Sequence, residues 1–305
     1  MIFTNGGERP CDDRSMLVIY NPTAGRRRVS RLWTVLDVLV AHGVRLEVVE
    51  TRHAGHAAEL AREAAHDPDR LVVAAGGDGT IAEVAAGLQG GRARLGIIPL
   101  GTANVLAHEL GLPMGAVGLA ATLASERQRP LWPGIATSAA GDRLFVQMLG
   151  IGFDAHVVHH VSRMAKRALG KGAYVAQTLR ELPRYGFEPI QLLIDGEAAE
   201  AGSVIVAKGS LYGGPYLLAP DARPDAPGFS VILFEQAGIG PALVAGAALP
   251  LNRLGRVPGA VHRRASEIVV RGTHALPAQA DGDPAGTTPL RITDAGSPIS
   301  VMVAR

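Results

Sequence analysis

The stretch Val72–Leu88, VVAAGGDGTIAEVAAGL, places a glycine-rich turn between an apolar run and an alanine-rich segment. The run over residues 71–75 is short and continuously apolar, which is typical of a strand buried on both faces of a parallel sheet. Beyond the turn apolar residues recur at helical spacing, and Thr80 and Glu83 match a capping box, so we expect a helix that begins at Thr80. The stretch therefore predicts a strand, a tight turn and a helix.

A turn of this kind suits a phosphate ligand. The first N–H groups of a helix carry positive partial charge, and glycine lets the backbone approach a ligand closely. Asp78 would repel a bare phosphate but fits if Mg²⁺ lies between them, so we interpret the turn as a Mg²⁺–nucleotide site. Two plainer interpretations stay open: a turn without a ligand, and Asp78 as an ordinary turn or cap residue.

The composition indicates a globular protein of about two domains. The chain has 305 residues, of which 47% are hydrophobic and 19% charged. A net charge of +2 gives no bias toward nucleic acid. The single cysteine, Cys11, cannot form an intrachain disulfide, which fits a reducing compartment. No apolar run of about 18 residues exists, and the longest candidate, 238–251, is interrupted by glycine and proline. We expect a cytoplasmic protein.

The order of predicted elements divides the chain near residue 133. Strands and helices alternate before it, which predicts an α/β domain with a parallel sheet over residues 1–133. Its strands are expected at 16–20, 44–50, 71–75 and 95–98, and its helices at 29–42, 56–66, 80–89, 102–110 and 116–125. Residues 134–305 begin with helices at 155–164 and 173–182. Strands then dominate, which predicts a mainly antiparallel β domain whose last strand, 299–303, is a candidate to return to the first sheet.

Three turns are expected at one edge of the parallel sheet, because ligands in such sheets bind beyond the carboxyl ends of the strands. They are NPTAG after the first strand, GGDGT after the third and PLGTAN after the fourth.

Several familiar phosphate-binding motifs are excluded or weak. The chain has no P-loop string and lacks the H-R-D and D-F-G motifs of protein kinases. Gly77, Gly79 and Ala82 match a loose dinucleotide fingerprint, but the next strand does not end in the acidic residue that this fold needs.

The ordered motifs resemble those of the diacylglycerol kinase catalytic-domain family, which includes bacterial lipid kinases and the sphingosine and ceramide kinases. The resemblance covers nearly the whole chain through NPTAG, GGDGTIAEV, PLGTAN, GIGFDA, YGGPYLLAPDA and ADGD. It implies a NAD-kinase-like α/β domain and a C-terminal β-sandwich. It also implies transfer of the ATP γ-phosphoryl group to a lipid hydroxyl, with Mg²⁺.

The resemblance assigns roles to individual residues. Asp78 would organise Mg²⁺, and in sphingosine kinases the matching aspartate is also discussed as the base. Asp283 stands where bacterial members carry the glutamate of a D-G-E motif, the proposed general base. The nucleotide would be held by Asn21, Gly25, Thr51, Gly76, Gly77, Asp78, Gly79, Thr80, Gly101, Thr102 and Asn104.

Three departures from the family pattern concern the chemistry rather than the fold. Asp283 is shorter than glutamate by one methylene. Val105 stands where the family's G-T-x-N-D motif has its acidic residue. The D-D-G turn, which binds a structural Mg²⁺ in bacterial members, reads PDAPGF, so that Asp225 is the remaining candidate metal ligand and Ala226 occupies the usual position.

The expected partner is a lipid at a membrane surface. A basic stripe, Arg163, Lys166, Arg167 and Lys171, fits peripheral contact with anionic headgroups or, alternatively, a solvated helix face. His156, His159 and His160 have spacing that could hold Zn²⁺, but a partly exposed helix face is the favoured interpretation. The oligomeric state stays open, a homodimer included.

Two rival functions remain. A kinase of NAD-kinase type shares the GGDGT loop, but the Asn-Glu pair of those enzymes is absent. A homologue that binds nucleotide or lipid without catalysis would agree with the three departures.

Overall fold

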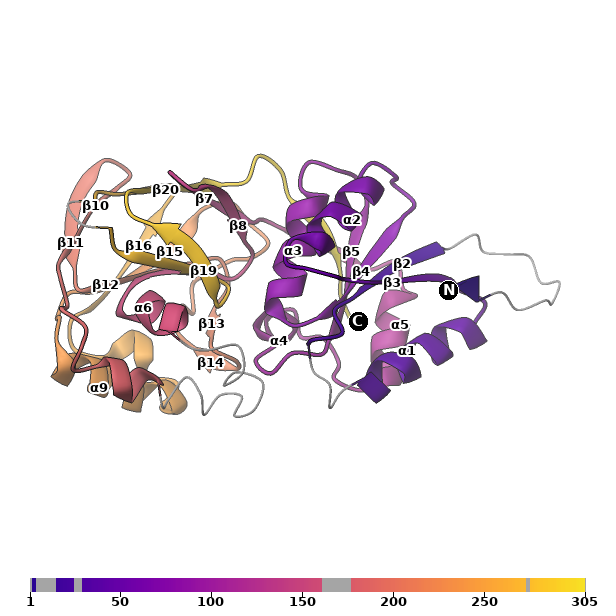
Figure 1. Cartoon of the computed structure of the whole chain (residues 1–305), viewed down its shortest axis with the longest axis horizontal. Coiled ribbons are helices and arrows are strands. Elements are labelled where there is room, and N and C mark those ends of the chain that lie inside the picture. Colours follow the sequence, from indigo (N-terminus) through magenta and orange to yellow (C-terminus); the bar gives the residue numbers. More distant parts are fainter. Residues whose placement is uncertain (1, 4–14, 25–28, 161–176, 273–274, 305) are drawn as a thin grey trace. The chain divides into compact units, whose positions relative to one another are not determined.

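The computed structural model describes residues 2–3, 15–24, 29–160, 177–272 and 275–304. The chain forms two compact units, one of residues 1–131 with 296–305 and the other of residues 132–295 (Figure 1). The sequence placed the boundary after residue 133, and the last ten residues now belong to the first unit. No helix of the described residues has the length and apolarity to cross a membrane.

The first unit is built on a seven-stranded sheet of order β1-β3-β2-β4-β5-β21-β6. The pairs β2–β3, β2–β4, β4–β5 and β5–β21 are parallel. Its elements are β1 (Ile2–Phe3), β2 (Ser15–Tyr20), α1 (Val29–Ala41), β3 (Arg45–Glu50), α2 (His56–Ala64), β4 (Leu71–Gly76), α3 (Asp78–Leu88), β5 (Arg94–Pro99), α4 (Val105–Glu109), α5 (Ala116–Leu123), β6 (Gln128–Leu131) and β21 (Ile299–Met302). The predicted α/β fold with a parallel sheet is confirmed.

The strand order places a topological switch between β2 and β4. The chain leaves β2 toward β3 on one side, and β4 leads toward β5 on the other. Crevices at the carboxyl ends of such strand pairs are the usual ligand sites of open α/β sheets. All six residues of β4 are buried, as expected for a strand covered on both faces.

Two helix boundaries differ from the sequence prediction. Helix α3 begins at Asp78 rather than Thr80, because the Glu83 carboxylate does not return to its own helix terminus. Glu83 Oε1 instead accepts a hydrogen bond from the Gly55 N–H at 3.0 Å, and Gly77 occupies the N-cap. Helix α4 begins at Val105 rather than 102, after Asn104 in a left-handed conformation with φ 49°.

The second unit is a sandwich of two six-stranded sheets with the orders β11-β10-β17-β20-β7-β8 and β16-β15-β12-β9-β18-β19. A third, two-stranded sheet joins β13 and β14. Apolar residues of both large sheets form one core, including Phe145, Leu192 and Ile292 from the first and Ile151 and Val206 from the second. All pairings in these sheets are antiparallel. The mainly antiparallel β-sandwich is therefore confirmed.

The elements of the second unit include several that the sequence reasoning did not predict, such as β9 and α9. They are β7 (Gly134–Ser138), β8 (Gly141–Phe145), β9 (Met148–Gly152), α6 (Phe153–His160), β10 (Ile190–Ile194), β11 (Glu197–Ala201), β12 (Ser203–Ala207), β13 (Leu211–Tyr212), β14 (Tyr216–Leu217), β15 (Phe229–Phe234), α9 (Ile239–Ala248), the 3₁₀ turns η2 (Leu249–Leu251) and η3 (Leu254–Arg256), β16 (Ala260–Ala265), β17 (Glu267–Val270), β18 (Pro277–Ala280), β19 (Asp283–Thr287) and β20 (Leu290–Asp294). The basic stripe Arg163–Lys171 lies outside the described residues.

Candidate functional site

Three turns meet at the carboxyl edge of the parallel sheet, as the sequence predicted. The Asn21 N–H, directly after β2, donates to Ala75 O at 3.0 Å. The Leu100 N–H, directly after β5, donates to Gly76 O at 2.8 Å. Thr51 follows β3, and its N–H donates to Tyr20 O at 2.8 Å. The turns after four neighbouring strands are therefore tied to one another by backbone hydrogen bonds.

Asn21 spans the switch between β2 and β4. Its Nδ2 donates to Thr80 Oγ1 at 3.0 Å, and its Oδ1 accepts from the Thr23 N–H at 2.9 Å and hydroxyl at 2.8 Å. Thr80 is only 6% exposed. Its hydroxyl therefore holds the turn together and is poorly placed to contact a ligand, unlike the N–H groups of the first turn of α3, which have no partner inside the helix.

Glycines of the GGDGT and PLGTAN turns pack closely against their neighbours. A Cβ on Gly101 would lie 2.6 Å from Gly77 Cα, and a Cβ on Gly76 would lie 2.5 Å from Thr80 Cβ. Contacts this short are sterically forbidden for real side chains. Glycine at these positions is therefore required by the packing of the turns themselves, in addition to any approach by a phosphate.

Asp78 joins the GGDGT turn to helix α4. Its Oδ1 accepts from the Leu106 N–H at 3.4 Å, and the backbone N–H groups of Asn104 and Val105 also stabilise the carboxylate. Burial raises the pKa of Asp78, against the opposing effect of these donors. Because the carboxylate accepts at the amino end of α4, Asp78 acts as a cap for that helix, which is the plainer role that the sequence had left open.

Asn104 carries a polar atom that the protein leaves unsatisfied. The residue is 3% exposed, and its Oδ1 has no hydrogen-bond partner among the described residues. A Cβ on Gly101 would lie 2.9 Å from this oxygen, so the atom faces the glycine turn. A buried acceptor without a partner is costly unless a ligand satisfies it. Carboxylate and amide oxygens are the donors that Mg²⁺ prefers, and Asp78 and Asn104 supply one of each.

The other predicted nucleotide residues are distributed around these turns. Thr102 is exposed and Thr51 half-buried, while Gly79 forms part of the first turn of α3. Gly25 lies outside the described residues. The described members of the predicted nucleotide set are thus brought to one edge of the sheet.

Asp283 begins strand β19 in the second unit. Its carboxylate is about half exposed and lies 4.0 Å from the Arg143 guanidinium. The neighbouring Asp281 has a different environment, because its carboxylate accepts from the N–H groups of Val146, Gln147 and Met148 at 2.8–2.9 Å. Asp281 thus fixes the turn, and Asp283 remains accessible to a ligand.

A buried polar network beside this turn was missed by the sequence reasoning. Asp154, on α6, accepts hydrogen bonds from the Tyr212 hydroxyl and, at 2.8 Å, from Gln279 Nε2. Gln279 Oε1 in turn accepts from the Gly282 N–H at 2.8 Å, which links the network to the Asp283 turn. Burial raises the pKa of Asp154, and the two hydrogen bonds oppose that rise. The GIGFDA and YGGPYLLAPDA motifs contain two of these residues, but their pairing is a long-range contact.

The turn that contains Asp225 holds a protein cation. Lys208 Nζ, fully buried, donates to the carbonyl oxygens of Ala226 at 3.1 Å and Gly228 at 2.9 Å and to Asp294 Oδ1 at 2.6 Å. Burial lowers the pKa of Lys208, and Asp294 opposes this effect. Asp225 itself accepts from Arg223 Nε at 3.0 Å. An ammonium on the carbonyl oxygens of the turn would repel a divalent ion, so these residues do not fit a second Mg²⁺ site.

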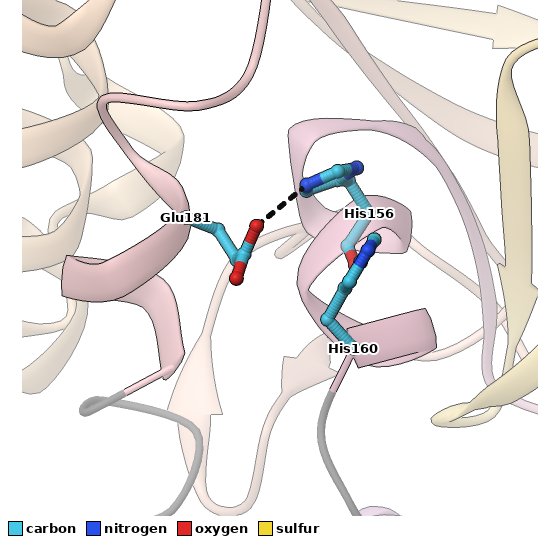
Figure 2. A group of neighbouring side chains, drawn as sticks. All are labelled: His156, His160 and Glu181. Carbon is cyan, nitrogen blue, oxygen red and sulfur yellow. Dashed lines mark hydrogen bonds and ion pairs between the residues drawn. The ribbon is translucent and has the colours of Figure 1, made fainter.

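The predicted histidine group has a carboxylate partner. His156 Nε2 lies 3.1 Å from Glu181 Oε2, and His160 is a neighbour of His156 (Figure 2). Gln177 Nε2 donates to Glu181 Oε1 at 2.8 Å, and the Arg184 guanidinium lies 3.8 Å from the same oxygen. Burial would raise the pKa of Glu181, but the hydrogen bond from His156 and the nearby His160, His156 and Arg184 lower it below its usual range. Both carboxylate oxygens therefore have partners within the protein, and the cationic Arg184 disfavours a metal ion here. His159 bonds instead to Ala278 O at 3.0 Å.

Comparisons with known proteins agree with this architecture. Residues 15–134 match the diacylglycerol kinase catalytic domain, and residues 147–304 match the YegS C-terminal NAD kinase beta sandwich-like domain. A diacylglycerol kinase of Bacillus subtilis is 32% identical over 228 residues, which cover 73% of this chain and 74% of the relative. One from Staphylococcus carnosus is 25% identical over 93% of both chains. A crystal structure of a diacylglycerol kinase from Bacillus anthracis superposes with a TM-score of 0.74 at 24% identity, covering 95% of this chain and 97% of the other. The chain belongs to the diacylglycerol kinase catalytic-domain family.

Proposed function

We propose that the protein is a lipid kinase that uses ATP and Mg²⁺ and transfers the γ-phosphoryl group to a hydroxyl of a lipid such as diacylglycerol or a sphingoid base. The names of the Bacillus and Staphylococcus relatives support the substrate class. The observation that carries the proposal is the unsatisfied Asn104 Oδ1, which faces the joined glycine turns where Asp78 also lies.

The first unit would bind the nucleotide. The N–H groups at the start of α3 bind its phosphates, and the close packing of Gly77 against Gly101 holds the two turns together beside them. Asp78 and Asn104 would hold Mg²⁺, which supplies charge neutralisation for the phosphates when bound. Asn21 and Thr51 border the same edge and orient the nucleotide. Most of the rate enhancement in phosphoryl transfer comes from such positioning and charge stabilisation.

Asp283 is the proposed general base. As the lipid oxygen forms its bond to the γ-phosphorus, its proton passes to the Asp283 carboxylate. The bond from the γ-phosphorus to the bridging oxygen breaks, and ADP leaves. The Arg143 guanidinium, 4.0 Å away, attracts the carboxylate, which stays about half exposed. The Asp154 network stabilises the adjoining turn through Gln279.

Turnover and nucleotide affinity of Asp283 variants test this assignment. Asp283→Asn keeps size and shape but cannot accept a proton, so turnover should fall by about 10²- to 10⁴-fold. Asp142→Asn is a matched control, because Asp142 is an exposed carboxylate of the same unit that accepts from Thr137 Oγ1 at 2.7 Å. Calorimetric ATP affinity should be unchanged in both variants. Wild-type turnover in Asp283→Asn would transfer the base role to Asp78.

A non-catalytic homologue is the second candidate. Val105, 9% exposed, offers no carboxylate where the family pattern has one beside the nucleotide turns. ATP binding with no phosphoryl transfer to any lipid would favour this candidate. An assay with NAD as acceptor distinguishes the lipid kinase and the non-catalytic homologue from a kinase of NAD-kinase type.

A further inference from the structure

Helix α9 and the turn after it form an apolar segment without charge. Residues 239–251 read IGPALVAGAALPL, and the helix buries none of its residues. Four large apolar side chains are exposed in it: Ile239 by 48%, Leu243 by 48%, Val244 by 52% and Leu251 by 67%. They are half of the eight large hydrophobic residues that are exposed in the described part of the chain. Figure 1 shows α9 on the outside of the second unit.

Helix α9 exposes large apolar side chains, which is the reverse of what is expected for a helix on a protein surface. Ala245 and Leu249 pack against a small core that includes Ile232 and Leu254. Leu243 and Val244 are instead about half exposed. A surface helix normally buries its large apolar side chains and presents charged ones to water. A contiguous exposed apolar patch of this kind marks an interaction surface.

The charge around the patch indicates what covers it. Residues 236–266 contain no aspartate or glutamate but four arginines. Arg263 pairs with Glu197 at 3.5 Å, and Arg264 donates to Asp221 O. Arg253 and Arg256 are exposed directly after the apolar segment, and no ion pair in the described residues involves them. An apolar face with cations at its margin is complementary to the surface of an anionic bilayer.

We propose that α9 and the following turn dock the protein on an anionic lipid bilayer, with Leu243 and Val244 at the acyl boundary and Arg253 and Arg256 among the headgroups. The inference rests on the proposed function only in that a lipid kinase must reach a membrane-bound substrate. The segment is too short and too interrupted to cross the bilayer, so it lies in the interface.

Co-sedimentation with sucrose-loaded vesicles, without nucleotide, tests the proposal. The vesicles are phosphatidylcholine alone or with about 30% phosphatidylglycerol. Leu243→Gln/Val244→Gln should lower binding to anionic vesicles by about 30-fold or more, because two partly inserted apolar side chains are lost. Arg253→Gln/Arg256→Gln should lower it about 25-fold, roughly fivefold per arginine, and weaken its salt dependence. Val117→Gln is the matched control, since Val117 is 68% exposed but belongs to the first unit.

Circular dichroism and the oligomeric state complete the experiment. The exposed substitutions should leave the fold and turnover on a dispersed short-chain lipid unchanged. Equal vesicle binding by wild type and the Leu243→Gln/Val244→Gln variant would overturn the proposal. So would a wild-type dimer in analytical ultracentrifugation that this variant abolishes without a change in vesicle binding, because the face would then join two copies. Vesicle binding without phosphoryl transfer would leave the docking surface intact and contradict only the proposed function.

Discussion

Replacing Lys208 by methionine tests whether the buried ammonium stabilises the fold of the second unit. Methionine keeps most of the side-chain volume but removes the donor to Asp294 and to the carbonyl oxygens of Ala226 and Gly228. Asp294 would keep its hydrogen bond from the Gly228 N–H but lose its counter-charge.

The structure sets the size of the effect. Lys208 is fully buried and the Asp294 side chain is 18% exposed, so the pair belongs to the buried class. Removal of one partner from such a pair costs about 3–5 kcal/mol, because the remaining charge stays buried without compensation. For a unit of this size that corresponds to a fall in Tm of roughly 6–20 °C. A second substitution, Asp294→Asn, should recover part of the loss, since it removes the uncompensated charge.

Tryptophan fluorescence during urea unfolding measures this change in the full chain. Trp132 reports on the second unit. Its backbone N–H donates to Pro224 O at 2.8 Å, just before the turn whose carbonyl oxygens accept from Lys208. Trp33→Phe removes the other tryptophan, which is exposed and in the first unit. Arg291→Met is the control, because its bond to Glu267 joins two solvent-accessible side chains and should be worth about 0–1 kcal/mol. If Lys208→Met lowers the free energy of unfolding no more than Arg291→Met does, the buried ammonium does not stabilise the second unit.

Three further predictions concern the site and its surroundings. Asp78→Asn should weaken MgATP binding in calorimetry yet raise Tm at pH 7. Because burial raises the folded-state pKa of Asp78, the charged carboxylate destabilises the fold at pH 7, whereas the protonated form below the ordinary pKa does not. Asparagine stays neutral at every pH, so the gain in Tm should vanish at low pH. A lower Tm of Asp78→Asn at pH 7 would contradict this. Glu181→Gln should lower the Tm at pH 7. Because the folded-state pKa of Glu181 is lowered, the difference in Tm between wild type and variant should disappear as pH falls through that pKa. A difference that does not depend on pH would argue against an ion pair of the Glu181 carboxylate. Gly101→Ala should reduce MgATP affinity about tenfold, because the new Cβ would push the two glycine-rich turns apart. Gly115→Ala is the control and should leave the affinity unchanged, since its Cβ meets nothing within 4 Å. Equal affinities for the two variants would show that the turns tolerate the shift.

The first unit could be predicted well from sequence because its signals are local. The continuous apolar run of β4 and the glycine-rich turns each lie within a few residues. The T-x-x-E capping box failed as a boundary signal, since Glu83 bonds to Gly55 of another helix terminus. A local pattern cannot show which of two nearby N–H groups a carboxylate will choose.

The second unit was harder to predict because its site depends on long-range contacts. Asp154 is 58 residues from Tyr212 and 125 from Gln279, and no spacing rule connects them. Lys208 belongs to no recognised motif. Its role follows only from the burial of its ammonium against the carbonyl oxygens of Ala226 and Gly228. The segment 238–251 is recognisably apolar in the sequence, but its glycines and prolines argued against a helix, so α9 was not predicted.

Transfer of label from [γ-³²P]ATP to lipid is the most direct test of the proposed lipid kinase activity. The wild-type chain would be incubated with Mg²⁺ and mixed micelles of diacylglycerol or sphingoid bases, with NAD as a soluble acceptor in a parallel reaction. We expect a labelled phospholipid that forms in equal amount with ADP and is lost when Mg²⁺ is chelated. Bound ATP with no labelled lipid, or label transferred to NAD instead, would contradict it.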